Sequence, residues 1–577
     1  MTTEHRPLSE RRTRLALLAA LVPLALALAM PPALEAQVPV QEGPLPLEVE
    51  RHAIELANAP GTLRLPGRAL VPEGSVVTGD VVVLGGGLRL GGRIAGELVV
   101  ANGDLVLAPG AVVEGAVLLL GGRLVLEEGA TAPADIRIHA APLRYRIRGD
   151  RVVGIGEGGV VPSRFLESDL GFGRTRFTLR ADGAYNRVEG LPVAFGPVVE
   201  TGGRNPLVLS AFGIWRSISG LSLDTDRMGY DVSLSQGIGG RGTASLALGA
   251  FRRMRPIEER GMSDLESSLS TFFMRRDYRD HYDAEGWDAT LTLRPITVPL
   301  RVELAFAEEE HGFAPIEGPW SLGDGERPWR LQPRVGEGRG TFFTGRVEWD
   351  SRDDPRHPAD GWWVRLEATR QLGGALSLPP SDFGPEVAFE RVSRGVVDLR
   401  RYARITPASS LRARYFMSGS LRGHPLPPQF QSALGGEGSL PGHRRFDVDC
   451  GAREGPLSFT LSSGENEAFT GYGCDRVRLA QLELVHALPL VWDPFPDGFG
   501  DPELAGLTRI QPSVSVFFNT GDGKAHTLEA IPNRRNERRH SDLGVGLGAG
   551  PLGLYWSYPL SESERGLNFF VRLDYRF

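Results

Sequence analysis

NFFVRLDYRF, residues 568–577, is the stretch of the chain that decides the fold. In an extended strand the side chains alternate between two faces. One face of this stretch would carry Phe569, Val571, Leu573, Tyr575 and Phe577, and the other would carry Phe570, Arg572, Asp574 and Arg576. An apolar face backed by a charged face suits the wall of a membrane barrel, where one side meets lipid and the other a wet lumen. The alternative is an edge strand of a soluble domain, and the preceding residues decide between the two.

The same two-residue period recurs upstream. Apolar residues alternate with small, polar or charged ones in 287–294, 300–307, 343–350 and 411–418. Charged side chains at this density would be costly inside a soluble sandwich, whereas a barrel lumen keeps them in water. The 74 glycines fit many turns between short strands, and no run of 18 apolar residues after the N-terminus marks a helical span. We therefore expect an all-β fold with a transmembrane β-barrel over residues 172–577.

The connections between these runs alternate between short and long. Barrels of outer membranes have short periplasmic turns and long outer loops, so this rhythm sets the topology. It predicts a 16-stranded antiparallel barrel that starts with 175–181, with eleven strands before the longest loop at 421–475 and five after it. The even number places both ends of the barrel on the periplasmic side. One connection, 489–508, is long where a short turn is expected.

Residues 1–36 have the features of an export signal peptide. Arg11, Arg12 and Arg14 precede an apolar core at 15–30, and residues 34–36 form a cleavage site. The core of 16 residues contains Pro23 and is short for a membrane span of about 20, so cleavage is favoured over a retained anchor helix. Export followed by insertion of the barrel predicts a location in the outer membrane, with a linker at 37–60 and a periplasmic N-terminal module.

That N-terminal module is repetitive. Segments 79–95, 96–114 and 115–133 each consist of short β-runs broken by glycine, and their starts lie 17 and 19 residues apart. One such unit cannot bury its apolar face alone, whereas stacked coils share a continuous core. The repeat therefore predicts a small β-solenoid at 61–140, followed by a linker at 141–171, and favours it over a β-sandwich. The expected inward or stacking residues are Val81, Val83, Val99, Leu105, Leu107, Val117, Leu119 and Leu126.

In composition, this module resembles the bactofilin-like, polymer-forming β-helical repeats. The resemblance implies a tether or a self-associating element and no catalytic chemistry.

The first of two informative segments of the barrel is 349–363 (WDSRDDPRHPADGWW), a strand end with an Asp–Arg–Asp pattern followed by a Pro-Gly turn. It resembles the corresponding segment of the BamA/TamA-type outer-membrane assembly family, also called the bacterial surface antigen family. Pro358 and Gly361 would form the tight turn. Asp350 and Arg352 would point into the lumen and pair there.

The second segment, 433–447 (ALGGEGSLPGHRRFD), resembles the family's loop that folds back into the barrel and carries an Arg-Gly-aromatic tip. The matching residues are Gly435, Gly436, Ser439, Leu440 and Gly442, while Pro441 and His443 stand where the family has arginine and an aromatic residue. Either Arg444 or Arg445 would then supply the positive charge. Its partners would be lumen carboxylates such as Asp350 and Glu348. A flexible glycine-rich surface loop is the alternative.

By resemblance, the chain would aid insertion or translocation of proteins or lipids at the outer membrane. The expected partners are outer-membrane lipid, the barrel assembly machinery that recognises the C-terminal strand, and a periplasmic or cell-wall partner of the solenoid. Two alternatives stay open: a structural anchor that displays a self-associating periplasmic solenoid, and a passive pore. The family's periplasmic docking domains have no counterpart, because residues 37–170 carry the solenoid pattern.

Catalytic signatures are absent from the sequence. It contains no G-x-S-x-G, H-E-x-x-H or Cys-x-x-Cys motif and no phosphate-binding Gly-Lys loop, so we expect no enzyme, cofactor or metal site. The net charge of −7 gives no support for nucleic-acid binding.

Cys450 and Cys474 lie 24 residues apart in an exported chain, which favours a disulfide over free thiols. Residues 308–311 (EEEH) fit a divalent-cation site or a solvated loop face, and 272–283 fit a partner surface or a short packed helix.

Overall fold

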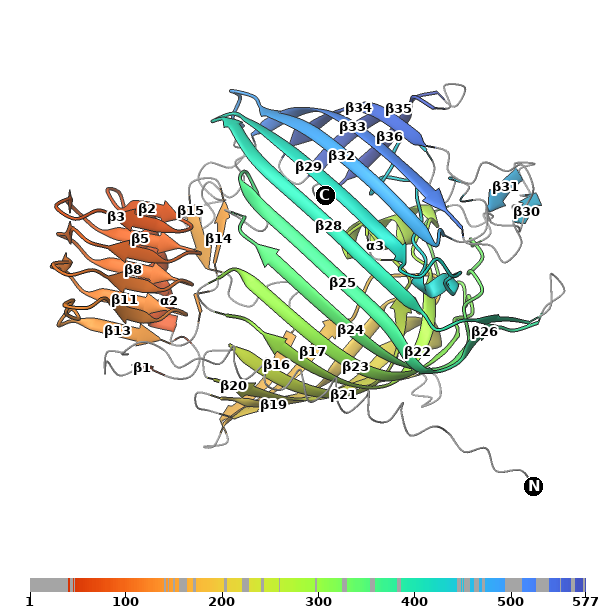
Figure 1. Cartoon of the computed structure of the whole chain (residues 1–577), viewed down its shortest axis with the longest axis horizontal. Coiled ribbons are helices and arrows are strands. Elements are labelled where there is room, and N and C mark those ends of the chain that lie inside the picture. Colours follow the sequence, from red (N-terminus) through yellow and green to blue (C-terminus); the bar gives the residue numbers. More distant parts are fainter. Residues whose placement is uncertain are drawn as a thin grey trace. The chain divides into compact units, whose positions relative to one another are not determined.

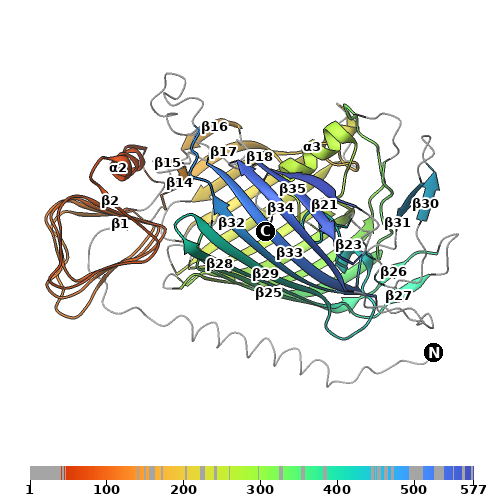
Figure 2. The ribbon, with the colours of Figure 1, turned by 90° about the horizontal axis from the view of Figure 1, so that it is seen from above.

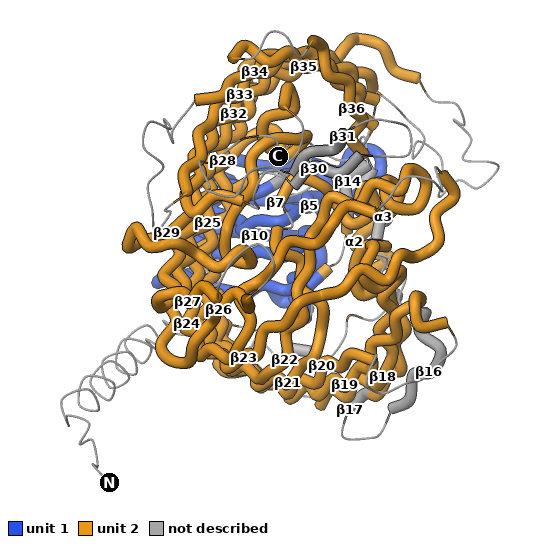
Figure 3. Tube along the Cα trace, turned by 90° about the vertical axis from the view of Figure 1, so that its right-hand side faces the viewer, with its two compact units in different colours: residues 1–41, 55–142 blue, residues 42–54, 143–577 orange. Residues whose placement is uncertain are grey.

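The computed structural model of the chain divides into two compact units, residues 1–41 with 55–142 and residues 42–54 with 143–577 (Figure 3). It describes residues 40–573 and 576 except for 42–44, 46, 140–141, 144, 149–150, 155–162, 170–172, 202–204, 221–227, 240–242, 259, 296–297, 324–328, 353–357, 381–385, 444–447, 449, 451–456, 461–465, 470–472, 493–510, 526–538, 550–551 and 562–565. The predicted signal peptide lies outside the described residues. Within them, no helix is long and apolar enough to cross a bilayer.

The first unit is a solenoid of three parallel sheets, and Figure 2 shows its coils end-on. One sheet contains β1 (Val40–Gln41), β13 (Ile136–His139), β11 (Val117–Leu120), β8 (Leu98–Ala101), β5 (Val81–Leu84) and β2 (Leu63–Pro66). The other two contain β10 (Val112–Val113), β7 (Arg93–Ile94) and β4 (Val76–Val77), and β12 (Leu124–Leu126), β9 (Leu105–Leu107), β6 (Leu88–Leu90) and β3 (Ala69–Val71). Val81 pairs with Leu98, and Leu98 with Val117. The paired residues are 17 and 19 residues apart, which are the spacings of the sequence repeat. The predicted solenoid is therefore confirmed.

Aliphatic side chains fill the interior of the solenoid. The predicted residues in this core are Val81, Val83, Leu105, Leu107, Val117 and Leu119, and Leu126 packs against it. Val99 is also fully buried, but Leu98 and Val100 take the places in the core cluster. Neighbouring coils approach closely at their glycine corners, because an added Cβ on Gly103 would lie 2.0 Å from the Gly86 carbonyl oxygen. Glycine in the repeat therefore sets the distance between coils.

An antiparallel sheet of seventeen strands forms the barrel of the second unit (Figure 1). The strands are, in order, β16 (Ser163–Asp169), β17 (Gly173–Ala181), β18 (Pro192–Thr201), β19 (Leu207–Arg216), β20 (Gly229–Ile238), β21 (Ala244–Pro256), β22 (His281–Leu293), β23 (Leu300–Phe313), β24 (Gly338–Asp350), β25 (Gly361–Gly374), β28 (Ser393–Thr406), β29 (Ser409–Ser420), β32 (Arg476–Ala487), β33 (Pro512–Lys524), β34 (His540–Ala549), β35 (Leu552–Pro559) and β36 (Asn568–Arg572). The sixteen predicted strands run from β17 to β36. The short β16, paired with β17, is an addition that lies in a segment expected to be a linker.

Smaller elements accompany the solenoid and the barrel. They are α2 (Leu47–Asn58), the hairpin β14 (Tyr145–Arg148) and β15 (Arg151–Gly154), η1 (Ser217–Ser219), α3 (Asp264–Met274), the hairpin β26 (Leu376–Leu378) and β27 (Val387–Phe389), η2 (Pro428–Phe430), and the hairpin β30 (Leu457–Thr460) and β31 (Asn466–Phe469). The helix α2 and the β14–β15 hairpin lie in segments expected to be linkers. The helix α3 ends inside 272–283, where a short packed helix was one of two alternatives.

The outer face of the barrel is apolar. In β36, Phe569 and Val571 are 53% and 46% exposed, while Phe570 and Arg572 between and beside them are 5% and 4% exposed. The same outward apolar row continues in other strands, for example at Leu248, Leu482, Val516 and Val545. Exposing this much apolar surface to water would be energetically unfavourable, whereas contact with the acyl chains of lipid is favourable. The wall is therefore that of an outer-membrane β-barrel, with its charged side chains on the inside.

Candidate functional site

The loop between β29 and β32 folds into the barrel. Gly435 and Gly436 have φ angles of 95° and 81°, in the left-handed region that glycine adopts without strain. Ser439 closes the turn, because its hydroxyl donates to the Gly435 carbonyl at 2.9 Å and its N–H donates to the Gly436 carbonyl at 3.0 Å. Leu440 has no exposed surface. We call residues 433–443 the lumen loop.

Inward-facing side chains of the wall hold the lumen loop. The Gln481 amide of β32 donates to the Ser439 carbonyl at 3.1 Å, and the Gly442 N–H donates to Asp542 Oδ2 of β34 at 3.0 Å. A side chain at Gly442 would collide with the wall, since an added Cβ would lie 2.7 Å from the Asp542 Cβ. The absence of a side chain at Gly442 therefore permits close contact between the lumen loop and the wall.

The last strand also holds the lumen loop. Asn568 Nδ2 of β36 donates to the Pro441 carbonyl at 2.6 Å. The ladder between β36 and β35 has five residue pairs, the fewest in the described wall, compared with ten between β33 and β34. Among the described strands, no ladder joins β36 to β16 or β17. The lumen loop is thus bonded to the strand that has the shortest ladder.

A further set of contacts comes from the connection between β21 and β22. Arg260 Nη2 donates to the Ala433 carbonyl at 2.7 Å, and the Ala433 N–H donates to Glu258 Oε2 at 3.1 Å. The two backbones touch next to this pair, because an added Cβ on Gly438 would lie 2.0 Å from the Gly261 Cα. The lumen loop is therefore held on both sides.

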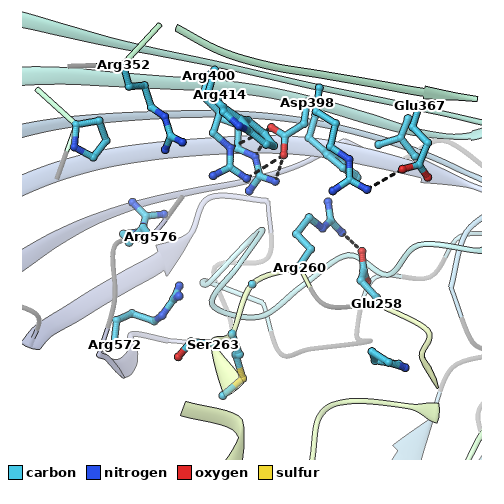
Figure 4. Close-up of a pocket in the computed structure, with 18 of the residues that line it drawn as sticks. Glu258, Arg260, Ser263, Arg352, Glu367, Asp398, Arg400, Arg414, Arg572 and Arg576 are labelled. Carbon is cyan, nitrogen blue, oxygen red and sulfur yellow. Dashed lines mark hydrogen bonds and ion pairs between the residues drawn. The ribbon is translucent and has the colours of Figure 1, made fainter. Parts of the chain in front are cut away.

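A cavity of about 570 Å³ lies inside the barrel beside these contacts (Figure 4). Its lining comes from β25, β28, β29, the end of the chain and the β21–β22 and β24–β25 connections. The charged lining residues are Arg260, Arg352, Arg365, Arg394, Arg400, Arg414, Arg572, Arg576, Glu258, Glu367 and Asp398. Eight arginines thus converge with three carboxylates, which we call the arginine cavity.

Asp398 of β28 is shared by two arginines of the cavity. Arg414 of β29 donates through Nε at 2.8 Å and through Nη2 at 2.6 Å, one bond to each carboxylate oxygen. Arg400 adds a bond through Nη2 at 3.0 Å. The bidentate pair fixes the orientation of Arg414, because its planar guanidinium matches the carboxylate.

Two further carboxylates are shared in the same way. The ion-pair distances at Glu367 are 2.9 Å to Arg346, 2.7 Å to Arg365 and 3.6 Å to Arg394. Those at Glu483 are 3.6 Å to Arg412 and 3.8 Å to Arg576. Like Asp398, each of these carboxylates is shared by two or three arginines, and Arg346 also pairs with Glu303 at 2.9 Å.

The outer loops interlock around Arg187, in the connection between β17 and β18. Arg187 has no exposed surface, and its guanidinium lies 3.1 Å from Asp277 and 2.5 Å from Asp280 of the β21–β22 connection. It also donates to Gln332, before β24, at 3.0 Å. Burial alone would raise the pKa of Asp277, but the charge of Arg187, the nearby His281 and the hydrogen bonds from the Arg187 and Arg279 N–H groups together outweigh it and hold that pKa below its usual value. One arginine therefore joins three outer loops.

Glu189 lies in the same outer layer. Arg216 Nε donates to its carboxylate at 2.9 Å, and the carboxylate is almost completely buried. Burial raises the pKa of Glu189 to about 7, even though Arg216 and Asn186 act in the opposite direction.

Of the predicted lumen partners, Asp350 and Arg352 pair, with Arg352 Nη2 2.6 Å from Asp350 Oδ2. Glu348 accepts a hydrogen bond from the Trp363 indole at 3.0 Å. Arg444 and Arg445 lie outside the described residues, and their suggested role stays a prediction. Cys450 and Cys474 are joined in a disulfide.

The C-terminal strand ends earlier than predicted. It stops at Arg572, because the Leu573 N–H donates to Glu266 Oε1 of α3 at 2.7 Å and not to a neighbouring strand. Arg576 is buried and donates to Asn519 of β33 at 3.1 Å. Tyr575 and Phe577 lie outside the described residues.

The acidic segment 308–311 lies in β23 and not in a loop. Glu309 pairs with Arg255 at 2.8 Å, and its second oxygen lies 2.9 Å from His311 Nε2. Across the described part of the chain, no cluster of three or more His, Cys, Asp or Glu side chains is arranged to hold a metal ion.

No protein-family model and no curated protein match the chain. Among solved structures, BamA from Haemophilus ducreyi lacking POTRA domains 1–3 is 13% identical, with 70% of each chain covered and a TM-score of 0.38. CdiB from Acinetobacter baumannii is 10% identical, with 70% of this chain and 60% of that chain covered and a TM-score of 0.28. CdiB from Escherichia coli is 11% identical, with 74% and 66% covered and a TM-score of 0.29. At these identities the likeness concerns the fold alone.

Proposed function

We propose that the chain is an outer-membrane barrel of the BamA/TamA type that helps proteins or lipids to enter or cross the outer membrane. The observation that carries the proposal is the hydrogen bond from Asn568 Nδ2 to the Pro441 carbonyl. It joins the lumen loop to the last strand of the wall, which has the shortest ladder. Displacement of the loop by cargo would therefore pull on the strand that is easiest to detach.

A detached β36 would offer unpaired backbone groups to another strand. Exposed strand edges pair readily with an incoming extended segment. The outward residues of β36, Phe569 and Val571, would keep that new pair in contact with lipid. This gives the barrel a way to guide a client strand into the bilayer, and it assigns cargo handling to residues 568–572.

The experiment uses cells in which the native chain is replaced by a variant, and it measures the amounts of other outer-membrane proteins. Asn568→Ala removes the bond to Pro441, and we expect fewer inserted barrels. Gln511→Ala is the matched control, because its amide also donates to a backbone carbonyl, that of Leu488 at 3.1 Å, but in an exposed position. Normal insertion in the Asn568→Ala strain, with the protein present at its usual amount, would contradict the proposal.

A passive pore is a rival function. The lumen loop and the interlocked outer loops occupy the barrel, which favours a low conductance. Single-channel recordings of the full chain in planar bilayers measure this directly. A large, stable conductance would support the pore and count against cargo handling.

The second candidate function is a structural anchor for the solenoid. It is favoured by an exposed row on the solenoid surface, in which Arg93 lies between Val76 and Val112, which are 61% and 42% exposed. Such a row would suit self-association or contact with the cell wall. Deletion of residues 60–140 separates the two functions. Weakened envelopes with normal insertion of other barrels would support the anchor, and a fall in other outer-membrane proteins would support assembly.

A further inference from the structure

The arginine cavity holds more positive charge than its own carboxylates neutralise. Glu367 is shared by Arg365 and Arg394, and Asp398 by Arg400 and Arg414, so each of these two carboxylates faces two arginines of the lining. Arg414 is 4% exposed and Arg576 is 2% exposed, so their guanidinium groups have little access to water. A partly buried charge without a counter-charge is costly. The cavity is therefore built for an anion.

Several N–H groups in the cavity have no acceptor among the described residues. They are Arg260 Nη1, Arg365 Nε, Arg394 Nε and Arg576 Nε, all buried. A buried donor without an acceptor costs about 1–3 kcal/mol, so a ligand that supplies several acceptor oxygens would be favoured. These four donors come from four strands or segments and line one cavity.

Arginine pairs particularly well with phosphate. Its planar fork donates two parallel hydrogen bonds to two phosphate oxygens, a geometry that lysine does not provide. A volume of about 570 Å³ lies in the range of small-molecule sites. It would hold a phosphorylated headgroup but not a folded protein segment.

We propose that the arginine cavity binds a phosphate-bearing anion, either the headgroup of a lipid or a free phosphate ester. Arg394 and Arg400 of β28 contact the phosphate, and Arg260 contacts it from the β21–β22 connection. Because Arg260 also bonds to Ala433, the ligand would brace the lumen loop in its place. The site is independent of what the barrel carries.

Two variants remove charge from the cavity without leaving a carboxylate unpaired. Arg394→Gln leaves Glu367 with Arg346 and Arg365. Arg400→Gln leaves Asp398 with the bidentate bond from Arg414. The matched control is Arg339→Gln, on an exposed arginine that pairs with Glu310 at 2.9 Å. All three variants are therefore expected to fold, and heat-dependent migration in SDS gels checks this.

Binding is measured by calorimetry on the full chain in a non-ionic detergent. The probes are inorganic pyrophosphate, glycerol 3-phosphate, dihexanoyl phosphatidic acid and hexaglutamate. We expect saturable binding of the phosphate probes that weakens as salt rises. Each cavity variant should weaken it at least about tenfold, while Arg339→Gln should leave it unchanged.

The probes also distinguish the source of the phosphate. Tighter binding of dihexanoyl phosphatidic acid than of glycerol 3-phosphate would support a lipid headgroup, and equal binding would support a free ester. The proposal is overturned if no phosphate probe binds, or if Arg394→Gln and Arg400→Gln bind as well as the parent chain. Binding of hexaglutamate alone would also overturn it, in favour of an acidic polypeptide.

Discussion

Glu266 and Arg572 form a hydrogen-bonded ion pair at 2.7 Å, although 306 residues separate them in the chain. Glu266 lies in the first turn of α3, and its other oxygen accepts the Ser263 N–H at 2.8 Å in a capping box. The oxygen that bonds to Arg572 also accepts the Leu573 N–H at 2.7 Å. One carboxylate therefore caps an outer-loop helix and ends the last strand of the barrel.

Glu266→Gln is expected to destabilise the barrel at neutral pH by about 1–3 kcal/mol, because hydrogen bonds to a charged group are lost. Burial would raise the pKa of Glu266, but Arg572 and the hydrogen bonds from the Ser263 and Leu573 N–H groups together outweigh it and lower that pKa. The stabilisation is therefore present above pH 4.5, the usual value, and is lost as the pH falls through the lowered pKa. The measurement is the midpoint temperature of heat-dependent migration in SDS gels.

The control for this variant is Glu310→Gln, because Glu310 is exposed and pairs with an exposed arginine. Such surface pairs contribute little. Equal midpoints for the two variants at neutral pH would show that Glu266 does not hold the last strand.

Arg187→Ala should loosen the outer loops, since it leaves Asp277 and Asp280 buried without their shared partner. Removing one member of a buried ion pair typically costs about 3–5 kcal/mol. We expect a lower midpoint temperature and faster cleavage of the outer loops by chymotrypsin in intact cells. Arg180→Ala is the control, because Arg180 is about half exposed and forms only a surface ion pair, at 3.4 Å, with Asp182. Unchanged cleavage of the Arg187→Ala variant would show that Arg187 does not hold the three outer loops together.

The wall of the barrel was predictable because its period of two is local. Alternation in 411–418 placed the charged residues of that run, Arg414 among them, on the lumen side, which the structure confirms through the ion pair of Arg414 with Asp398. Their convergence into a cavity was not predictable, since it depends on which inward residues meet across a curved sheet. The pair Glu266–Arg572 was equally hidden, because nothing local connects a helix cap with the end of the chain.

The lumen loop shows a different limit of prediction from the sequence. Its glycines were identified by resemblance, and the structure places them where left-handed φ angles or close contacts need glycine. The short β16 and the helix α2 escaped prediction, because both lie in segments where neither period is sustained. Long-range contacts decide such segments more than local propensity does.

Gly438→Ala should displace the lumen loop. Its added Cβ would lie 2.0 Å from the Gly261 Cα, so one backbone has to move. Overpacking of this kind typically costs about 1–3 kcal/mol. We expect a lower midpoint temperature and a higher single-channel conductance. Gly312→Ala is the control, because its nearest neighbour would be 3.8 Å away; a conductance change of the same size there would remove the steric explanation.

Glu189 gives the outer loops a pH dependence of the opposite sign to that of Glu266. Burial raises its pKa from 4.5 to about 7, so the folded state binds a proton more tightly than the unfolded state. Stability is then greatest below pH 4.5 and falls as the pH rises to about 7, by up to about 3 kcal/mol. Glu189→Gln removes the titrating group and should flatten midpoint temperatures measured between pH 5 and pH 7.5. Glu200→Gln, on an exposed acid of β18, should keep the slope of the parent chain. Parallel slopes in the Glu189→Gln variant and the parent would mean that another group causes the dependence.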